Sequence, residues 1–201
     1  MRVTLAAVVI CAVFFVLQLA VPGFTEFFAL TPAVALSGAY WQFITYIFLH
    51  GSFMHIFLNM FVLIMFGPIV ERKLGTYPYL ALFFLSGLGS AFLHIAITQD
   101  SFTILLGASG AIFGILTAYG FLYPKNWIIM FPGIPIPAVL AVFLFAGIEL
   151  FYGVSGLEAG VANFGHLGGI LTGIIFMLLW KYTRKSRAFE PFRANVEYFW
   201  E

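Results

Sequence analysis

Six long apolar stretches constrain what this sequence can fold into more than any other feature. Each runs for about 20 mostly apolar residues, the length that an α-helix needs to cross the hydrocarbon core of a bilayer. They cover residues 3–21, 52–70, 77–97, 104–123, 136–153 and 161–180. Because backbone groups in lipid must be satisfied within their own segment, these stretches predict helices. We therefore expect an all-α, polytopic membrane protein in which residues 1–201 form a single six-helix domain.

The composition agrees with a chain that is surrounded by a lipid bilayer. Only 8% of its residues are charged and 63% are hydrophobic, whereas about 25% of the residues of a soluble domain are charged. A net charge of +1 gives no reason to expect nucleic acid as a partner. The single cysteine, Cys11, excludes a disulfide within the chain.

The basic residues predict how the chain lies across the membrane. With the N-terminus in the cytoplasm, all nine Lys and Arg residues fall on the cytoplasmic side. They are Arg2, Arg72, Lys73, Lys125, Lys181, Arg184, Lys185, Arg187 and Arg193. The opposite loops contain Glu26, Asp100 and Glu158 instead. This positive-inside distribution predicts a multi-pass protein of the inner cell membrane with both termini in the cytoplasm.

Two of the connections between helices have a distinctive composition. The longest, residues 22–51, is rich in aromatic side chains, which favours a position partly within the outer membrane interface. The segment 132–137 has the sequence Pro-Gly-Ile-Pro-Ile-Pro, which predicts a rigid turn before the fifth helix.

Polar and ionisable side chains are costly inside a membrane, so each one in these stretches or beside them is a candidate functional residue. They are His50, His55, Asn59, His94, Ser109, Glu149, Asn163 and His166. Ser109 lies about five residues into the fourth stretch, or roughly 7–8 Å along a helix. His166 has a similar depth in the sixth stretch, and His55 and Asn59 share one face at the start of the second. We therefore expect four side chains capable of catalysis in one layer.

The motif Gly107-Ala108-Ser109-Gly110 allows two interpretations. Small neighbours let another chain approach the serine hydroxyl and the backbone N–H groups, as acyl transfer requires. Alternatively, Gly110 and Gly114 belong to a stripe of small residues that packs helices together. The two interpretations are compatible because packing glycines can hold a catalytic serine in place.

His166 is the candidate general base, since a neutral imidazole can accept the serine proton and return it to a leaving amine. The stripe formed by Gly165, Gly169 and Gly173 can bring the sixth helix against the fourth. The alternative is a histidine that is satisfied by a neighbouring carbonyl group.

The remaining polar residues also have structural alternatives. His55 and Asn59 can donate hydrogen bonds to a developing oxyanion, or they can form a polar clamp between helices. Glu149 is either a proton carrier or, more simply, a protonated carboxyl group bonded to a neighbour. His94, at the end of the third stretch, is expected to face the outer interface. The histidines lack the clustering of metal ligands, so neither a metal nor another cofactor is expected.

Together these motifs resemble those of the rhomboid family of intramembrane serine proteases. The matching elements are His50-x4-His55-x3-Asn59, Glu71-Arg72-x-Leu74-Gly75, Gly107-Ala108-Ser109-Gly110 and His166-x2-Gly169-x3-Gly173. Their order and their common depth carry the resemblance, which extends from the first helix to the sixth. It implies the minimal six-helix form of the fold, without an additional N-terminal domain or a seventh helix.

The resemblance implies a role for each matching residue. Ser109 is the nucleophile and His166 is the general base. The backbone N–H of Ser109 and the side chains of His55 and Asn59 form the oxyanion hole. The family works with a Ser–His dyad, so no acidic residue is required.

The resemblance also implies supporting residues and shows one departure. Phe113 stands where some relatives have a tyrosine that stacks on the catalytic histidine. The Trp-Arg pair of the family's first loop is Trp41-Gln42 here, so the salt bridging of that loop is in doubt. The supporting residues are Gly107, Gly110, Phe113 and Gly169.

The implied reaction is hydrolysis of a peptide bond near the outer end of a transmembrane segment in a membrane-protein substrate. The substrate helix must first unwind locally, because its carbonyl groups are hidden in hydrogen bonds. By analogy with the family, lateral access involves the fifth helix and its loop to the sixth. Two other functions stay open: an inactive relative that binds and retains membrane clients, and a small transporter that uses Glu149 and the histidines as a proton path.

Overall fold

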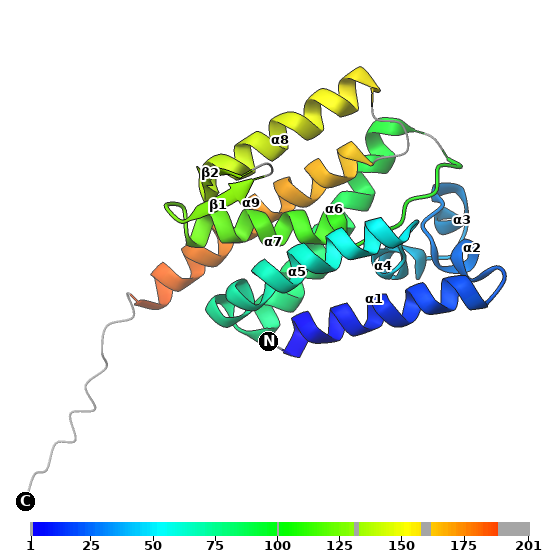
Figure 1. Ribbon diagram of the computed structural model, residues 1–201, viewed down its shortest axis with the longest axis horizontal. Helices are drawn as coiled ribbons and strands as arrows, with labels where there is room; N and C mark the ends of the chain where they lie inside the picture. The colour runs from blue at the N-terminus through cyan, green and yellow to red at the C-terminus, as the bar shows by residue number, and fades with distance from the viewer. Residues whose placement is uncertain (1, 100, 131–132, 158–161, 189–201) are drawn as a thin grey trace, which may run out of the picture.

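The computed structural model describes residues 2–99, 101–130, 133–157 and 162–188, with backbone only for Met130 and residues 185–188. Long helices run side by side along the bundle (Figure 1). Five of the described helices are long and apolar enough to cross a membrane. They are α1 (Arg2–Ala20), α5 (Phe53–Leu74), α6 (Thr76–Thr98), α8 (Ala138–Ser155) and α9 (Asn163–Ala188). A shorter apolar helix, α7 (Ser109–Leu122), lies among them.

The fourth stretch differs from its expected bounds of 104–123, because α7 begins only at Ser109. The residues before it are held in an extended conformation. The backbone groups of Leu105 and Leu30 exchange two hydrogen bonds, of 2.9 and 3.0 Å, and the N–H of Gly107 donates to the carbonyl oxygen of Tyr46 at 2.9 Å. These contacts with the first loop take up backbone groups that a helix would otherwise use.

A small β-hairpin precedes α8, where the sequence predicted only a rigid turn. Strand β1 (Trp127–Met130) pairs antiparallel with β2 (Ile134–Pro137), so Trp127 lies opposite Pro137. The fifth helix therefore begins at Ala138 rather than at residue 136. Pro132 and the expected start of the sixth helix at residue 161 lie outside the described residues.

The first loop folds into four short helical segments at one end of the bundle (Figure 1). They are α2 (Phe24–Phe28), α3 (Pro32–Leu36), α4 (Gln42–Thr45) and the 3₁₀ turn η1 (Tyr46–Phe48). Trp41 Nε1 and Gln42 Nε2 both donate to the carbonyl oxygen of Phe27, and Gln42 Oε1 accepts from the N–H of Thr31. Gln42 is only 1% exposed. A neutral amide thus cross-links this loop, without a salt bridge at Gln42.

Glycines set the closest contacts between α6, α7 and α9. A Cβ atom added to Gly169 of α9 would collide with the carbonyl oxygen of Gly110 in α7. One added to Gly168 would collide with that of Gly89 in α6. At these two points the backbone of α9 meets the backbones of α7 and α6 with no side chain between them, as stripes of small residues allow in membrane helices.

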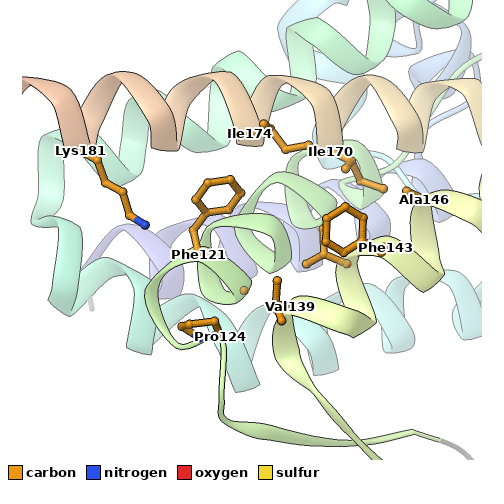
Figure 2. Close-up of a pocket in the computed structure, with 10 residues that line it drawn as sticks. Phe121, Pro124, Val139, Phe143, Ala146, Ile170, Ile174 and Lys181 are labelled. Atoms are coloured by element: carbon orange, nitrogen blue, oxygen red, sulfur yellow. The ribbon is translucent and has the colours of Figure 1, made fainter.

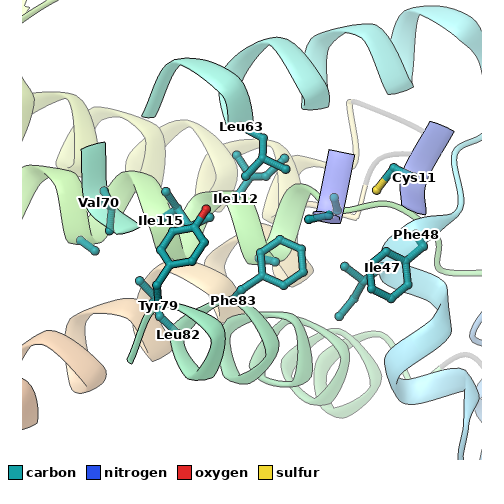
Figure 3. Close-up of a cluster of buried hydrophobic side chains, with 14 of the residues drawn as sticks. Cys11, Ile47, Phe48, Leu63, Val70, Tyr79, Leu82, Phe83, Ile112 and Ile115 are labelled. Carbon is teal, nitrogen blue, oxygen red and sulfur yellow. The ribbon is translucent and has the colours of Figure 1, made fainter. Parts of the chain in front are cut away.

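Larger apolar side chains fill the space between α5, α6 and α7. Figure 3 shows Tyr79 and Phe83 of α6 near Leu63 of α5 and Ile112 and Ile115 of α7. All five are buried. This cluster fixes α7 against α5 and α6, so the helix that begins at Ser109 is held on more than one side.

The charged ends of the helices gather at one end of the bundle. The start of α1, the α5–α6 junction, the turn from α7 to β1, the hairpin and the end of α9 lie there, opposite α2 and α3 (Figure 1). These segments contain Arg2, Arg72, Lys73, Lys125, Lys181 and Arg184. Asp100, Glu158 and Arg193, which also entered the predicted topology, lie outside the described residues.

Glu71 near the end of α5 caps the N-terminus of α1. Its carboxylate accepts hydrogen bonds from the backbone N–H groups of Val3 and Thr4, at 3.1 and 3.0 Å, and from the Thr4 hydroxyl at 2.7 Å. The first N–H groups of a helix have no partner within it and favour a negative charge. Glu71 is 2% exposed, so this cap is buried between α1 and α5.

We expect Glu71→Ala to lower the free energy of unfolding by about 3 kcal/mol, because it leaves several buried donors without an acceptor. Equilibrium unfolding of the protein in mixed micelles, followed by tryptophan fluorescence, measures the change. Glu26→Ala, at an exposed position in α2, is the matched control and should change stability by no more than about 0.5 kcal/mol. Equal stability of the two variants would contradict the capping role.

Candidate active site

Ser109 is the first residue of α7, and an extended segment leads into it. The sequence placed it about five residues inside a helix, and that placement is wrong because the helix starts later. Gly107 has φ +124°, a conformation that side-chain-bearing residues rarely adopt, and an added Cβ would lie 2.8 Å from His55 Cε1. Glycine at this position therefore lets the His55 ring approach the turn before the serine.

His166 lies in the first turn of α9, where its backbone N–H donates to the carbonyl oxygen of Ala162. Its Nε2 atom is 2.8 Å from Ser109 Oγ. Gly169 follows His166 by three residues, and Gly110 follows Ser109 directly; the contact between these two glycines sets the distance between α9 and α7. The structure thus brings the hydroxyl and the imidazole within hydrogen-bonding distance.

An aromatic ring covers one face of the imidazole. The ring centroids of Phe113 and His166 are 4.7 Å apart, with 32° between the ring planes. Phe145 of α8 meets Phe113 edge-on, with ring centroids 5.9 Å apart. Because Phe113 lies one turn after Ser109 in α7, the same helix supplies the hydroxyl and the surface against which the histidine ring rests.

His55 and Asn59 lie in the first turns of α5, after the helix-capping residue Ser52. His55 Nδ1 accepts a hydrogen bond from the N–H of Gly51 at 3.3 Å, which places the proton of the neutral ring on Nε2. Asn59 Nδ2 donates to the carbonyl oxygen of His55 at 2.9 Å, so one of its two amide hydrogens is used within α5.

One cavity of about 340 Å³ brings the predicted side chains together. Four of its lining residues are the candidate catalytic and oxyanion-binding side chains. They are His55, Asn59, Ser109 and His166. Gly51, Ile104, Leu105, Leu106 and Ala162 complete the lining. The supporting glycines Gly110 and Gly169 act instead through helix packing.

His50 packs behind His55, with ring centroids 5.0 Å apart. Burial, and secondarily the neighbouring His55, lowers the pKa of His50 to about 4, so its ring is neutral at neutral pH. The side chain of Gln18 in α1 bonds both the backbone N–H and the carbonyl oxygen of His50, at 2.9 and 3.3 Å. The loop that leads to His55 is therefore tied to α1.

His94 does not face the outer interface as the sequence predicted. It is only 5% exposed within the last turns of α6. It does not line the cavity that contains Ser109.

Glu149 joins the site, which the sequence did not predict. Its Oε2 atom lies 3.0 Å from His166 Nδ1 and accepts a hydrogen bond from Asn163 Nδ2 at 2.9 Å. The available signal was an ionisable residue inside an apolar span, which is by itself a reason to expect a functional site. The sequence does not show how α8 is rotated about its own axis, and this rotation turns the Glu149 side chain toward α9.

A larger cavity, of about 400 Å³, lies between α7, α8 and α9 but contains none of these groups. Figure 2 shows its apolar lining, which includes Phe121, Val139 and Phe143, with Lys181 at one end. Its size exceeds that of the polar cavity, yet its described lining has no hydroxyl, thiol, imidazole or carboxyl group. The chemistry of the side chains, rather than the volume, identifies the candidate active site.

The fold and the site define an α-helical membrane protein with a serine and a histidine in contact. The sequence pattern of the rhomboid domain matches residues 37–182. The chain is 32% identical to RHOMBOID-like protein 6, mitochondrial, of Arabidopsis thaliana over 160 residues, which cover 79% of this chain and 49% of that protein. It is 30% identical to Rhomboid protease AarA of Providencia stuartii over 164 residues, which cover 72% and 57%.

The chain belongs to the rhomboid family. It spans about half the length of the curated relatives that it matches. A shorter match, of 87 residues at 36% identity, joins it to the putative rhomboid protease YdcA of Bacillus subtilis and covers 43% of each chain.

Proposed function

We propose that this protein is an intramembrane serine endopeptidase. The observation that carries the proposal is the 2.8 Å contact between Ser109 Oγ and His166 Nε2 inside a polar cavity of a membrane-helix bundle. Membership of a family that includes a protein named as a protease supports it. A serine hydroxyl is a weak nucleophile until a base accepts its proton, and this contact provides that base.

The reaction proceeds through an acyl-enzyme. Ser109 Oγ attacks the substrate carbonyl carbon while its proton passes to His166 Nε2, and the same proton then reaches the leaving amine nitrogen as the C–N bond breaks. Water next attacks the ester and gives one proton to His166 Nε2. That proton returns to Ser109 Oγ as the new carboxyl group leaves.

Hydrogen-bond donors around the cavity would stabilise the tetrahedral oxyanion. The His55 Nε2–H, the free hydrogen of the Asn59 amide and the backbone N–H of Ser109 are the donors that we assign. Ser109 begins a helix, so the positive end of the helix dipole adds to their effect. Each such donor is worth about 10²–10³-fold in rate in serine proteases.

The substrates that fit this site are transmembrane segments of other proteins. A peptide bond must leave its helix to reach Ser109, so Gly, Pro or β-branched residues near the bond should favour cleavage. The basic residues at one end of the bundle favour cytoplasmic termini in a cell membrane, with the site nearer the outer face.

Labelling and cleavage in liposomes test this function together. The purified protein should cleave a reporter with one transmembrane segment, and a fluorophosphonate should attach to Ser109 as located by peptide mass spectrometry. Folded protein that binds the reporter but neither cleaves it nor reacts with the probe would favour an inactive, client-binding relative. Proton-coupled uptake that survives Ser109→Ala would instead support a transporter.

A further inference from the structure

We propose that Glu149 is a positioning residue that orients His166, so that this site works as a Ser–His–Glu triad. The proposal rests on the proposed protease function and extends the dyad that the family resemblance implies. Ser109 Oγ is 2.8 Å from Nε2 of the ring, and Glu149 Oε2 is 3.0 Å from Nδ1. The two ring nitrogens thus face the nucleophile and a carboxyl group respectively.

The carboxyl group is held in place from the same helix that carries the histidine. Asn163 Nδ2 donates to Glu149 Oε2 at 2.9 Å, and Asn163 precedes His166 by three residues on one face of α9. Both side chains of the Glu149–His166 contact are largely buried, with 12% and 14% of their surface exposed. Because Asn163 already holds the Glu149 side chain, its contact with the His166 ring costs little further conformational entropy.

The tautomer of His166 follows from these contacts. If Nε2 is to accept the serine proton, the neutral ring must carry its own proton on Nδ1. Within the described part of the chain, Nδ1 makes no hydrogen bond of good geometry, and Glu149 Oε2 is the acceptor at contact distance. Such contacts often tighten only when substrate is bound.

Glu149 takes no proton in the reaction. When Ser109 attacks, His166 becomes an imidazolium, and the adjacent carboxylate stabilises its positive charge and keeps Nε2 directed at the reacting atoms. The other groups that face the ring are Phe113 of α7 and, as a more distant titratable group, His55 of α5. Neither of these supplies an acceptor at Nδ1.

Three substitutions at this position separate positioning from packing. Glu149→Gln keeps the size of the side chain but removes its charge, Glu149→Leu removes the acceptor, and Glu149→Asp keeps a carboxyl group. We expect kcat to fall at least about tenfold for Gln and further for Leu, with KM unchanged. Glu149→Asp should be faster than both. Leu150→Ala, at an exposed neighbouring position in α8, should match the wild type.

The outcomes distinguish this proposal from the proposed function. If the wild type cleaves the reporter and Ser109→Ala does not, but Glu149→Gln keeps the wild-type kcat, the triad is wrong and the dyad stands. If Asp is no faster than Gln, or if kcat falls only in proportion to the unfolded fraction, Glu149 has a packing role and the proposal is overturned. A wild type that neither cleaves nor reacts with fluorophosphonate ends the protease assignment itself.

Discussion

A Ser109→Ala variant is expected to cleave a transmembrane reporter at least about 10³-fold more slowly than the wild type. Its hydroxyl is the nucleophile in the contact with His166 Nε2, and no other hydroxyl lines the described polar cavity. Release of the new N-terminal fragment in liposomes, followed with time at saturating reporter, measures the effect.

The matched variant His166→Ala should lose a similar amount of activity, and the double variant should lose little more. Residues that act as one unit are strongly non-additive because either loss removes the same step. The fold of Ser109→Ala should be intact, since the substitution removes one oxygen atom from a partly exposed residue. Cleavage by Ser109→Ala at more than a tenth of the wild-type rate would overturn the assignment of the nucleophile.

The second large effect is expected from a methyl group added at Gly169, which does not line the polar cavity. A Cβ at position 169 would collide with the carbonyl oxygen of Gly110, which belongs to a backbone that cannot turn aside. α9 must therefore move away from α7 and carry His166 away from Ser109. We expect Gly169→Ala to lower kcat by about 10²-fold, since a displacement of about 1 Å can have that effect.

The same substitution should cost about 1–3 kcal/mol of stability through overpacking. The control is Gly147→Ala in α8, where an added Cβ meets nothing within 4 Å. It should keep full activity and gain up to about 1 kcal/mol from its better helix propensity. Thermal unfolding, followed without the fluorophosphonate probe, measures the folded fraction of each variant. Dividing the cleavage rate by that fraction separates the displacement of His166 from the loss of stability. Equal activity of the two variants would show that the close contact of α7 and α9 does not set the site.

The sequence was sufficient for the features that depend on lipid. A span such as that of α6 is readable because every residue over a known length must be apolar, and its observed bounds, Thr76–Thr98, differ from the expected 77–97 by one residue at each end. The stripe of small residues at Gly165, Gly169 and Gly173 likewise pointed to α7, because close backbone contact needs glycine.

The sequence failed where a neighbour decides the local structure. Hydrophobicity continues through residues 104–108, yet Leu105 pairs with Leu30, which is 75 residues earlier, and α7 begins later than expected. The hairpin of β1 and β2 was likewise not predicted, because β2 contains prolines, which are unusual in strands. Neither pairing leaves a periodic signal in the residues themselves.

Most side chains of the candidate site could be chosen from the sequence, but the contact of Glu149 with His166 could not. Ser109, His166, His55 and Asn59 could be chosen because polar residues are expensive in lipid and lie at similar positions along their helices. Glu149 was recognised as expensive too, but its partner could not be named. That choice depends on how α8 is rotated against α9, and most of the surface of α8 is apolar and gives little information about rotation.

The attachment of α8 has a consequence for the timing of the reaction. It is the least buried of the five long spans, yet it brings Glu149 to the histidine ring. If α8 swings outward to admit a substrate from the lipid, the carboxyl group leaves with it and the imidazole loses its anchor. Substrate entry and the Glu149–His166 contact would then exclude one another. Ser109 would have a correctly oriented base only after α8 has returned to its position against α9.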